Sequence, residues 1–401
     1  MCLSYRKIIL TNKVILENMN TNRFETFYDA VLAIVITILV LKIPQPLSPT
    51  WGAVFANSLN FSTYAIVFLA IINIWYNNHH LFQIFDEINN RALFAYGLSL
   101  FLTSLFPYFA LWISTNLYSL TAETIFGIII IFANLSHIIA LLAVYGANGY
   151  NDRLENLNIK PIHILFPIII LILGFIISYT VYPPAIYVAC LLSVVVSIIY
   201  NRVQREEFED TERFEALIDA IVAIIITIIV LEIPLAADGS LGALLDLKLE
   251  FFAYIISFIV VFNMWKLTYN IFAIVNKINY NVIWSVATML FFLSLIPYLT
   301  IFVSRNFHEF VPQFLYGLDF MIISICSFIG TYQMKRLDKS NVYLQKTFDN
   351  YNNFIITMVL TCIFIIIGYY YYPPIIIISC LLSIAIQWIF IVKKINLLEI
   401  V

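Results

Sequence analysis

The sequence predicts an all-α membrane protein with twelve transmembrane helices, arranged as two parallel six-helix repeats. Two observations predict this class. First, 62% of the 401 residues are apolar, only 11% are charged and the mean hydropathy is +0.93, far from the composition of a soluble domain. Second, the chain repeats itself at a fixed distance of 190 residues. A soluble enzyme is therefore excluded.

The repeat is clearest in two segments that begin with the same signature. Residues 23–44 contain Arg-Phe-Glu, then Asp-Ala, an apolar run and Ile-Pro, and residues 213–234 contain the same pattern. The distance of 190 also separates Trp75 from Trp265 and Pro107 from Pro297. Six spans return the chain to its starting side, so the second repeat has the orientation of the first.

Apolar runs long enough to cross roughly 30 Å of hydrocarbon give the individual helices. They begin near residues 25, 56, 91, 123, 161 and 184, and again near 215, 250, 281, 312, 353 and 374. We assign residues 1–200 to the first repeat, 201–212 to a solvated connector and 213–401 to the second repeat. No separate soluble domain is expected.

The positive charges predict the topology. Lysines and arginines gather at the two ends of the chain and in the loops after even-numbered spans; only Lys42, Lys248 and Arg305 of the 21 fall on the other side. By the positive-inside rule, both termini of this multi-pass protein should be cytoplasmic.

Cysteines and histidines show no pattern typical of a chemical site. Four of the five cysteines lie in apolar stretches without paired spacing, so neither a disulfide framework nor a metal site is indicated. The histidines and intramembrane aspartates have no recognised catalytic spacing. We therefore expect no enzyme, no cofactor and no nucleic-acid partner.

The first helix of each repeat carries an apolar stripe at the i, i+3/4, i+7 spacing. Its members are Ile34, Thr37 or Ile38, and Leu41 in the first copy, and Ile224, Thr227 or Ile228, and Leu231 in the second. Ordinary helix packing explains the spacing equally well. The shared charged start, central threonine and terminal proline favour a helix that lines a pathway.

Asp29 and Asp219 lie away from this stripe. An unpaired buried carboxylate is costly, so we favour a structural ion pair or hydrogen bond over direct ion binding. The expected partners are Arg23 and Arg213, or the polar groups of the next helix, such as Asn73 and Asn263.

At these residues the chain resembles the endosomal, lysosomal and prokaryotic potassium channels called the transmembrane protein 175 family. The family signature is Arg-x-x-x-Phe-Ser-Asp-Ala, followed by an apolar helix with Thr and a Leu-Glu-Ile ending. The matching residues are Arg23, Phe27, Asp29, Ala30, Thr37 and Leu41, then Arg213, Asp219, Ala220, Thr227, Leu231, Glu232 and Ile233, with Trp75, His79, His80, Pro107 and Tyr108 further along.

The resemblance implies a potassium channel in a lipid bilayer, with a prokaryotic cell membrane as its expected location. It implies a homodimer in which residues 25–43 and 215–233 of each chain line the pore. The implied constriction consists of Ile34, Ile224, Ile38, Ile228, Leu41 and Leu231, with Thr37 and Thr227 as hydroxyls that tune selectivity and potassium as the permeant ion. A Thr-Val-Gly-Tyr-Gly filter is missing from the sequence, and so is the periodic arginine series of a voltage sensor. A leak channel is therefore expected.

The sequence also departs from the family pattern. Tyr28 and Ile218 replace the signature serine, and Lys42 stands where the second copy has Glu232. In a dimer, two lysines and two glutamates would make the outer mouth nearly neutral. His79 and His80 have a structural or a pH-sensing interpretation, and both stay open.

A twelve-helix secondary transporter of a small solute or cation is the main alternative. Parallel six-helix repeats with cytoplasmic termini are typical of that class as well. The short loops and the lack of a discontinuous helix at matching positions favour the channel.

Overall fold

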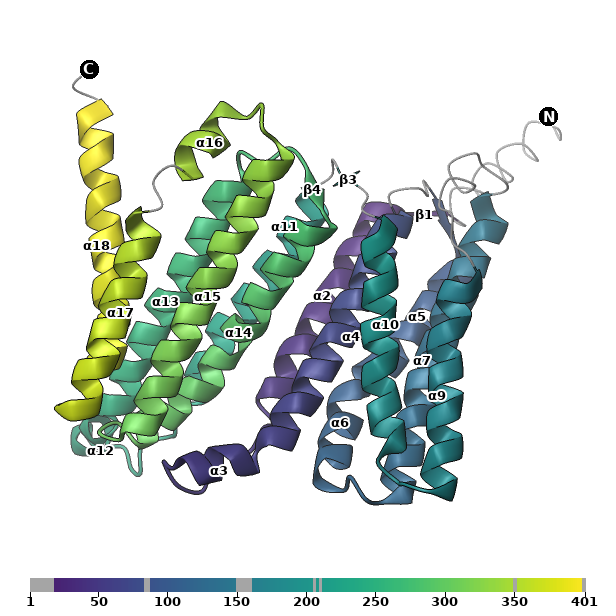
Figure 1. Ribbon diagram of the computed structural model, residues 1–401, viewed down its shortest axis with the longest axis horizontal. Coiled ribbons are helices and arrows are strands. Elements are labelled where there is room, and N and C mark those ends of the chain that lie inside the picture. The colour runs from purple at the N-terminus through teal and green to yellow at the C-terminus, as the bar shows by residue number, and fades with distance from the viewer. Residues whose placement is uncertain are drawn as a thin grey trace, which may run out of the picture. The chain divides into compact units, whose positions relative to one another are not determined.

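Helices account for nearly all of the computed structural model, which describes residues 18–82, 87–148, 161–204, 207–208, 211–348 and 352–398 (Figure 1). The first repeat contains α2 (Thr21–Val40), α3 (Trp51–Ala56), α4 (Ser58–Phe82), α5 (Asn90–Ser104), α6 (Phe106–Thr115), α7 (Leu120–Asn148), α9 (Pro161–Thr180) and α10 (Ala185–Gln204).

The second repeat follows the same order. It contains α11 (Glu212–Leu231), α12 (Leu241–Asp246), α13 (Lys248–Phe272), α14 (Tyr280–Arg305), α15 (Phe310–Leu337), α16 (Val342–Phe348), α17 (Asn352–Tyr370) and α18 (Ile375–Leu398). Five of these helices, α12, α13, α14, α15 and α18, begin 190 residues after their counterparts α3, α4, α5, α7 and α10. The sequence repeat is therefore also a structural repeat.

The lengths of the helices suit a membrane. Within the described residues, eight helical segments are long and apolar enough to cross a bilayer, with α5 and α6 together forming one of them. Three shorter apolar helices lie within α9, α17 and α18, and α2 corresponds to the spanning helix α11. Together they make the twelve spans of two six-helix repeats, so the predicted all-α membrane fold is confirmed.

Two short antiparallel strand pairs mark the same place in each repeat. In the first, β1 (Asn18–Asn20) pairs with β2 (Glu87–Asn89), and in the second, β3 (Glu207–Phe208) pairs with β4 (Ile278–Asn279). Each pair joins the segment before the first span to the segment before the third span. The pairing thereby fixes where these two spans begin.

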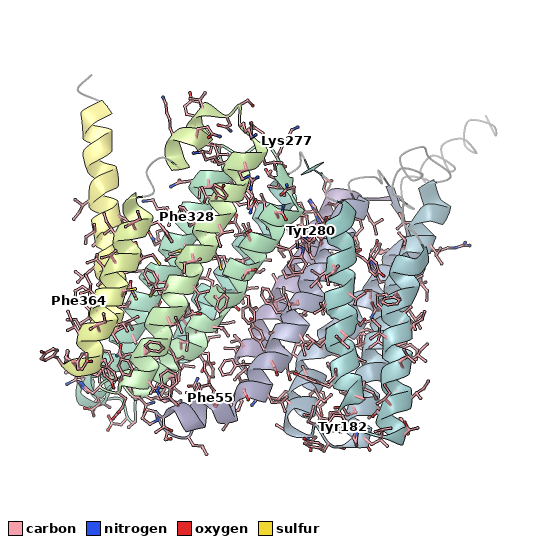
Figure 2. All side chains as sticks on the ribbon, viewed as in Figure 1. Phe55, Tyr182, Lys277, Tyr280, Phe328 and Phe364 are labelled. Carbon is pink, nitrogen blue, oxygen red and sulfur yellow. The ribbon has the colours of Figure 1, made fainter. Side chains whose placement is uncertain are left out.

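By its contacts, the chain divides into two compact units, which we describe separately. Unit 1 consists of Met1–Lys42 and Leu59–Gln204, and unit 2 consists of Ile43–Ser58 and Arg205–Val401. The segment 43–58 belongs by sequence to the first repeat, yet it packs with the second. It includes α3, on which Phe55 lies, whereas Tyr182 of unit 1 lies in the turn between α9 and α10 (Figure 2).

The core of unit 1 begins with an aromatic cluster at the start of α2. Phe24, Tyr28, Phe82 and Tyr96 are all buried, and their ring centroids lie 5.1–6.0 Å apart. In unit 2, Phe214 and Phe272 keep one of these ring contacts at 5.8 Å. The cluster ties the first, second and third spans of unit 1 together, whereas the contact kept in unit 2 joins the first and second spans.

Candidate ion-conduction helices

The helices α2 and α11 are uninterrupted because their apolar runs contain neither glycine nor proline. Each is 20 residues long, about 30 Å at 1.5 Å per residue, which matches the hydrocarbon core. Both end shortly before an Ile-Pro pair, Ile43-Pro44 or Ile233-Pro234, because a residue that precedes proline avoids the α conformation.

Most of α2 is enclosed by its own unit, where it packs on α5 and α6. The enclosed residues of its central part are Leu32, Ala33, Val35, Ile36, Thr37, Leu39 and Val40. Between them, Ile34 and Ile38 are 43% and 38% exposed, and Phe27 is exposed nearer the start of the helix. Helix α2 thus leaves uncovered one narrow apolar stripe.

Peripheral helices of the same units look different. On α9, the exposed apolar residues are Phe166, Ile169, Ile172, Leu173, Ile176 and Ile177. These residues include adjacent pairs and cover a broad face, as expected for a helix in contact with lipid. The stripe on α2 is too narrow for such a face.

The two copies expose different faces of their first helix. On α11, Thr227 and Leu231 are exposed, Ile224 is half-buried and Ile228 is buried. On α2, Thr37 is buried instead, and its hydroxyl donates to the carbonyls of Ala33 (2.9 Å) and Ile34 (3.1 Å). The spacing left open whether the threonine or the following isoleucine belongs to the exposed stripe. Unit 1 exposes the isoleucine, Ile38, and unit 2 exposes the threonine, Thr227.

The signature aspartate of the second copy is held by a tryptophan. The Trp265 indole N–H of α13 donates to Oδ1 of Asp219 over 2.7 Å. Asn263, one of the partners that the sequence predicts for this aspartate, instead accepts a hydrogen bond from Trp388 of α18 at 2.7 Å. Two residues along a helix turn the side chain by about 200°, so Asn263 and Trp265 serve opposite sides of α13.

In the first copy, too, the asparagine of the second span bonds to the sixth span. Asp29 is buried near the start of α2, whereas Asn73 of α4 donates to the hydroxyl of Ser197 at 2.8 Å and accepts from Asn201 at 2.8 Å, both on α10. Asn73 thus links the second and sixth spans. Of the signature arginines, Arg23 is exposed and Arg213 is buried.

The replacement of the signature serine has different effects in the two copies. Tyr28 is fully buried, and its hydroxyl accepts a hydrogen bond of 2.6 Å from the side-chain amide of Asn78 on α4. At the matching place in unit 2, Ile218 is buried, and Thr268 donates to the carbonyl of Met264 in its own helix. Tyrosine thus supplies a link between helices that isoleucine cannot make.

Of the two predicted histidines, His79 is buried and stacks on Trp75, with centroids 4.9 Å apart and an interplanar angle of 15°. The side chain of His80 lies outside the described part of the structure. Among the described residues, no three His, Cys, Asp or Glu side chains are placed to hold a metal ion.

Comparison with known proteins identifies the family. The family model described as endosomal/lysosomal potassium channel TMEM175 matches residues 23–107 and 213–297. A protein of Chryseobacterium sp. (strain P1-3), named a potassium channel, is 32% identical over 137 residues, which are 34% of this chain and 71% of that protein. The chain belongs to the TMEM175 family.

Two further relatives of this TMEM175-family chain are also named potassium channels. One, from Streptomyces collinus, is 32% identical over 92 residues, which are 22% of this chain and 45% of that protein. The other, from Chamaesiphon minutus, is 32% identical over 100 residues, which are 23% of this chain and 48% of that protein. The chain thus spans about half the length of these two relatives.

Both TMEM175 matches cover the same elements, which are the first two spans of a repeat and most of the third. At the proline ends of the two first helices, Lys42 is exposed and Glu232 is half-buried. Beyond Glu232, the side chain and backbone of Ser240 donate hydrogen bonds that lower the pKa of Asp238. This end of the second repeat therefore keeps a fixed negative charge.

Proposed function

We propose that this TMEM175-family chain forms a potassium-permeable channel. Two chains associate as a homodimer, and α2 and α11 of each chain surround a central pore, with both termini in the cytoplasm. Family membership supports potassium as the ion. The observation that carries the assignment of the pore is the narrow uncovered stripe of Ile34 and Ile38 on a helix otherwise enclosed by its unit.

The mechanism follows from the chemistry of this stripe. Isoleucine side chains offer no hydrogen bonds, so an ion that passes a tight ring of them must give up part of its water shell. Potassium holds its water less strongly than sodium and loses it at lower cost. A narrow apolar ring can therefore favour potassium without a filter of backbone carbonyls.

The central test replaces Ile34 and Ile224 by alanine in the same chain. Shorter side chains widen the narrowing, so the double variant should carry more current and discriminate less between potassium and sodium. The measurement is the bi-ionic reversal potential of purified protein in planar bilayers. Ile172→Ala on the lipid-facing part of α9 is the matched control and should leave both quantities unchanged. Unchanged selectivity in the double variant would contradict this assignment.

Flux through liposomes separates a channel from a secondary transporter. A channel should dissipate a potassium gradient without a second ion, at a rate that stays proportional to the gradient. A transporter would saturate and would depend on its coupled ion. Saturation and dependence on a coupled ion would overturn the proposed channel in favour of a secondary transporter.

A further inference from the structure

The two repeats contain matching outer segments, which we call hairpin 1 (residues 43–58) and hairpin 2 (residues 233–248). Each has a six-residue helix, α3 or α12. Thr50 caps the first helix by accepting from the Ala53 N–H, and Ser240 caps the second by accepting from the Ala243 N–H. The two capping residues lie 190 residues apart, so the two hairpins are equivalent segments of the two repeats.

Hairpin 1 docks on the second repeat, within unit 2. The Tyr298 hydroxyl of α14 donates to the Pro44 carbonyl at 3.1 Å, and the Gln45 amide donates to the Tyr298 carbonyl at 3.2 Å. The ring of Trp51 meets Phe314 of α15 edge-on, with centroids 5.5 Å apart. Tyr298 is only 4% exposed as a result. The third and fourth spans of a repeat therefore form a receptor for a hairpin.

The equivalent receptor on the first repeat is uncovered. Tyr108 of α6 corresponds to Tyr298 and is 68% exposed. Thr124 of α7 corresponds to Phe314, and its hydroxyl lies 2.9 Å from that of the exposed Tyr179. Unit 1 thus keeps the tyrosine of the receptor, has Thr124 where the second repeat has Phe314, and carries no hairpin on this face within the described residues.

Hairpin 2 is equally uncovered. Leu235 and Leu241, which correspond to Gln45 and Trp51, are 96% and 71% exposed, and Leu244 and Leu245 are exposed as well. These leucines lie on or just before the short helix α12 and remain largely exposed in unit 2. They are expected to be buried against a partner surface.

We propose that hairpin 2 docks on α6 and α7 of a second copy of this chain, in the way that hairpin 1 docks on α14 and α15. This rests on the homodimer of the proposed function. Tyr108 of the second copy then donates to the Pro234 carbonyl, and Leu241 packs over Thr124 and Tyr179. In a ring of four repeats, each repeat gives one hairpin and receives one, so a head-to-tail contact closes after two chains.

The partner is a second copy because the receptor of the second repeat is already filled by hairpin 1. The uncovered receptor of the same kind lies on a first repeat. Within a chain, hairpin 1 of the first repeat docks on the second repeat. By the same rule, hairpin 2 of the second repeat docks on the first repeat of the next chain.

Cross-linking between differently tagged chains tests the proposal. All five native cysteines are replaced by alanine; one chain then carries Leu241→Cys and the other Thr124→Cys, and both are co-expressed and treated with a short bismaleimide. Because each chain holds one thiol, a cross-linked band with both tags can arise only between chains. We expect such a band, and a second pair, Pro234→Cys with Tyr108→Cys, should give it as well.

Two controls give the yield of cross-linked product for a known contact and for a mismatched pair. Trp51→Cys with Phe314→Cys in one chain should react within that chain, because hairpin 1 is seen in contact with α15. Phe132→Cys replaces Thr124→Cys as the mismatched partner, since it is exposed on the same helix but two turns away, about 12 Å at 1.5 Å per residue. It should give little product.

The oligomeric state in lipid nanodiscs, measured by light scattering, separates the two proposals. A dimer whose bands stay at the level of the Phe132→Cys control would overturn the docking of hairpin 2 and leave the channel intact. So would a Leu241→Cys, Thr124→Cys double variant that cross-links only within one chain. A conducting monomer would overturn the homodimer itself.

Discussion

At the scale of single residues, the two copies have drifted apart while they keep the same backbone. Tyr28 fills the space in the aromatic cluster and reaches Asn78, whereas Ile218 fills the matching space without any hydrogen bond. Hydrogen bonds between membrane helices contribute only modestly to stability. A position can therefore lose one if the apolar packing is preserved.

The Tyr28–Asn78 hydrogen bond can be tested with Tyr28→Phe. The ring stays in the cluster, but the buried amide of Asn78 loses this acceptor, so the variant should be less stable by about 1 kcal/mol. Thermal unfolding in detergent, followed by fluorescence, measures the loss. Tyr370→Phe is the control, because the Tyr370 side chain is exposed and water can replace the contacts of its hydroxyl. Equal stability of Tyr28→Phe and wild type would show that the bond contributes nothing.

At the scale of elements, close packing between the fifth and sixth spans relies on a glycine, but not at the same position in each copy. A methyl group on Gly174 of α9 would overlap the side chain of Ala189 and approach the Ala185 carbonyl to 3.2 Å. The second copy has Phe364 at the matching position (Figure 2) and instead uses Gly368, which would meet Ile376 at 2.7 Å. Small residues let membrane helices approach closely. In each repeat, one glycine is enough for the close approach of the fifth and sixth spans.

Gly174→Ala should therefore separate α9 from α10. The backbone carbonyl of Ala185 cannot move without its helix, so we expect a loss of about 1–3 kcal/mol and a lower yield of monodisperse protein. Gly97→Ala on α5 is the control. A methyl group there meets nothing within 4 Å, and alanine favours the helix, so stability should stay equal or rise. A stable Gly174→Ala variant would contradict the packing described for this pair.

At the scale of the whole molecule, the proposed dimer has a mixed outer mouth. Each chain contributes the exposed Lys42 and the half-buried Glu232 at the proline ends of its two first helices. Four acidic residues would concentrate cations near the pore, whereas two lysines and two glutamates largely cancel. We therefore expect a lower potassium conductance than four acidic residues at these positions would give.

Lys42→Glu should restore an acidic mouth. The single-channel potassium current at low salt should rise, and the increase should fade at high salt, where the Debye length is only about 3 Å at 1 M. Planar-bilayer recordings at two ionic strengths measure both effects. Lys339→Glu is the charge-matched control, because Lys339 is exposed in the loop after α15, on the side of the membrane opposite to Lys42 in the predicted topology. A low-salt current equal to that of wild type would rule out an electrostatic role for Lys42.

Much of this architecture could be read from local sequence. The expected helix starts near 56, 91 and 250 lie within two residues of α4, α5 and α13, because polar or proline residues bound long apolar runs. The choice between Thr37 and Ile38 could not be read in this way. Both fit the same stripe, and only the packing of α2 against α5 and α6 decides which side chain is covered.

The sequence by itself determined that the protein is a membrane protein with two parallel repeats, since hydropathy and the 190-residue spacing are properties of local segments. It also determined which helices carry the family signature. Only the tertiary structure decided that hairpin 1 belongs to the unit of the second repeat, that Trp265 holds Asp219, and which face of α2 stays uncovered. These features depend on contacts between residues far apart in the chain, and no local pattern records which of several equally apolar or polar surfaces will meet.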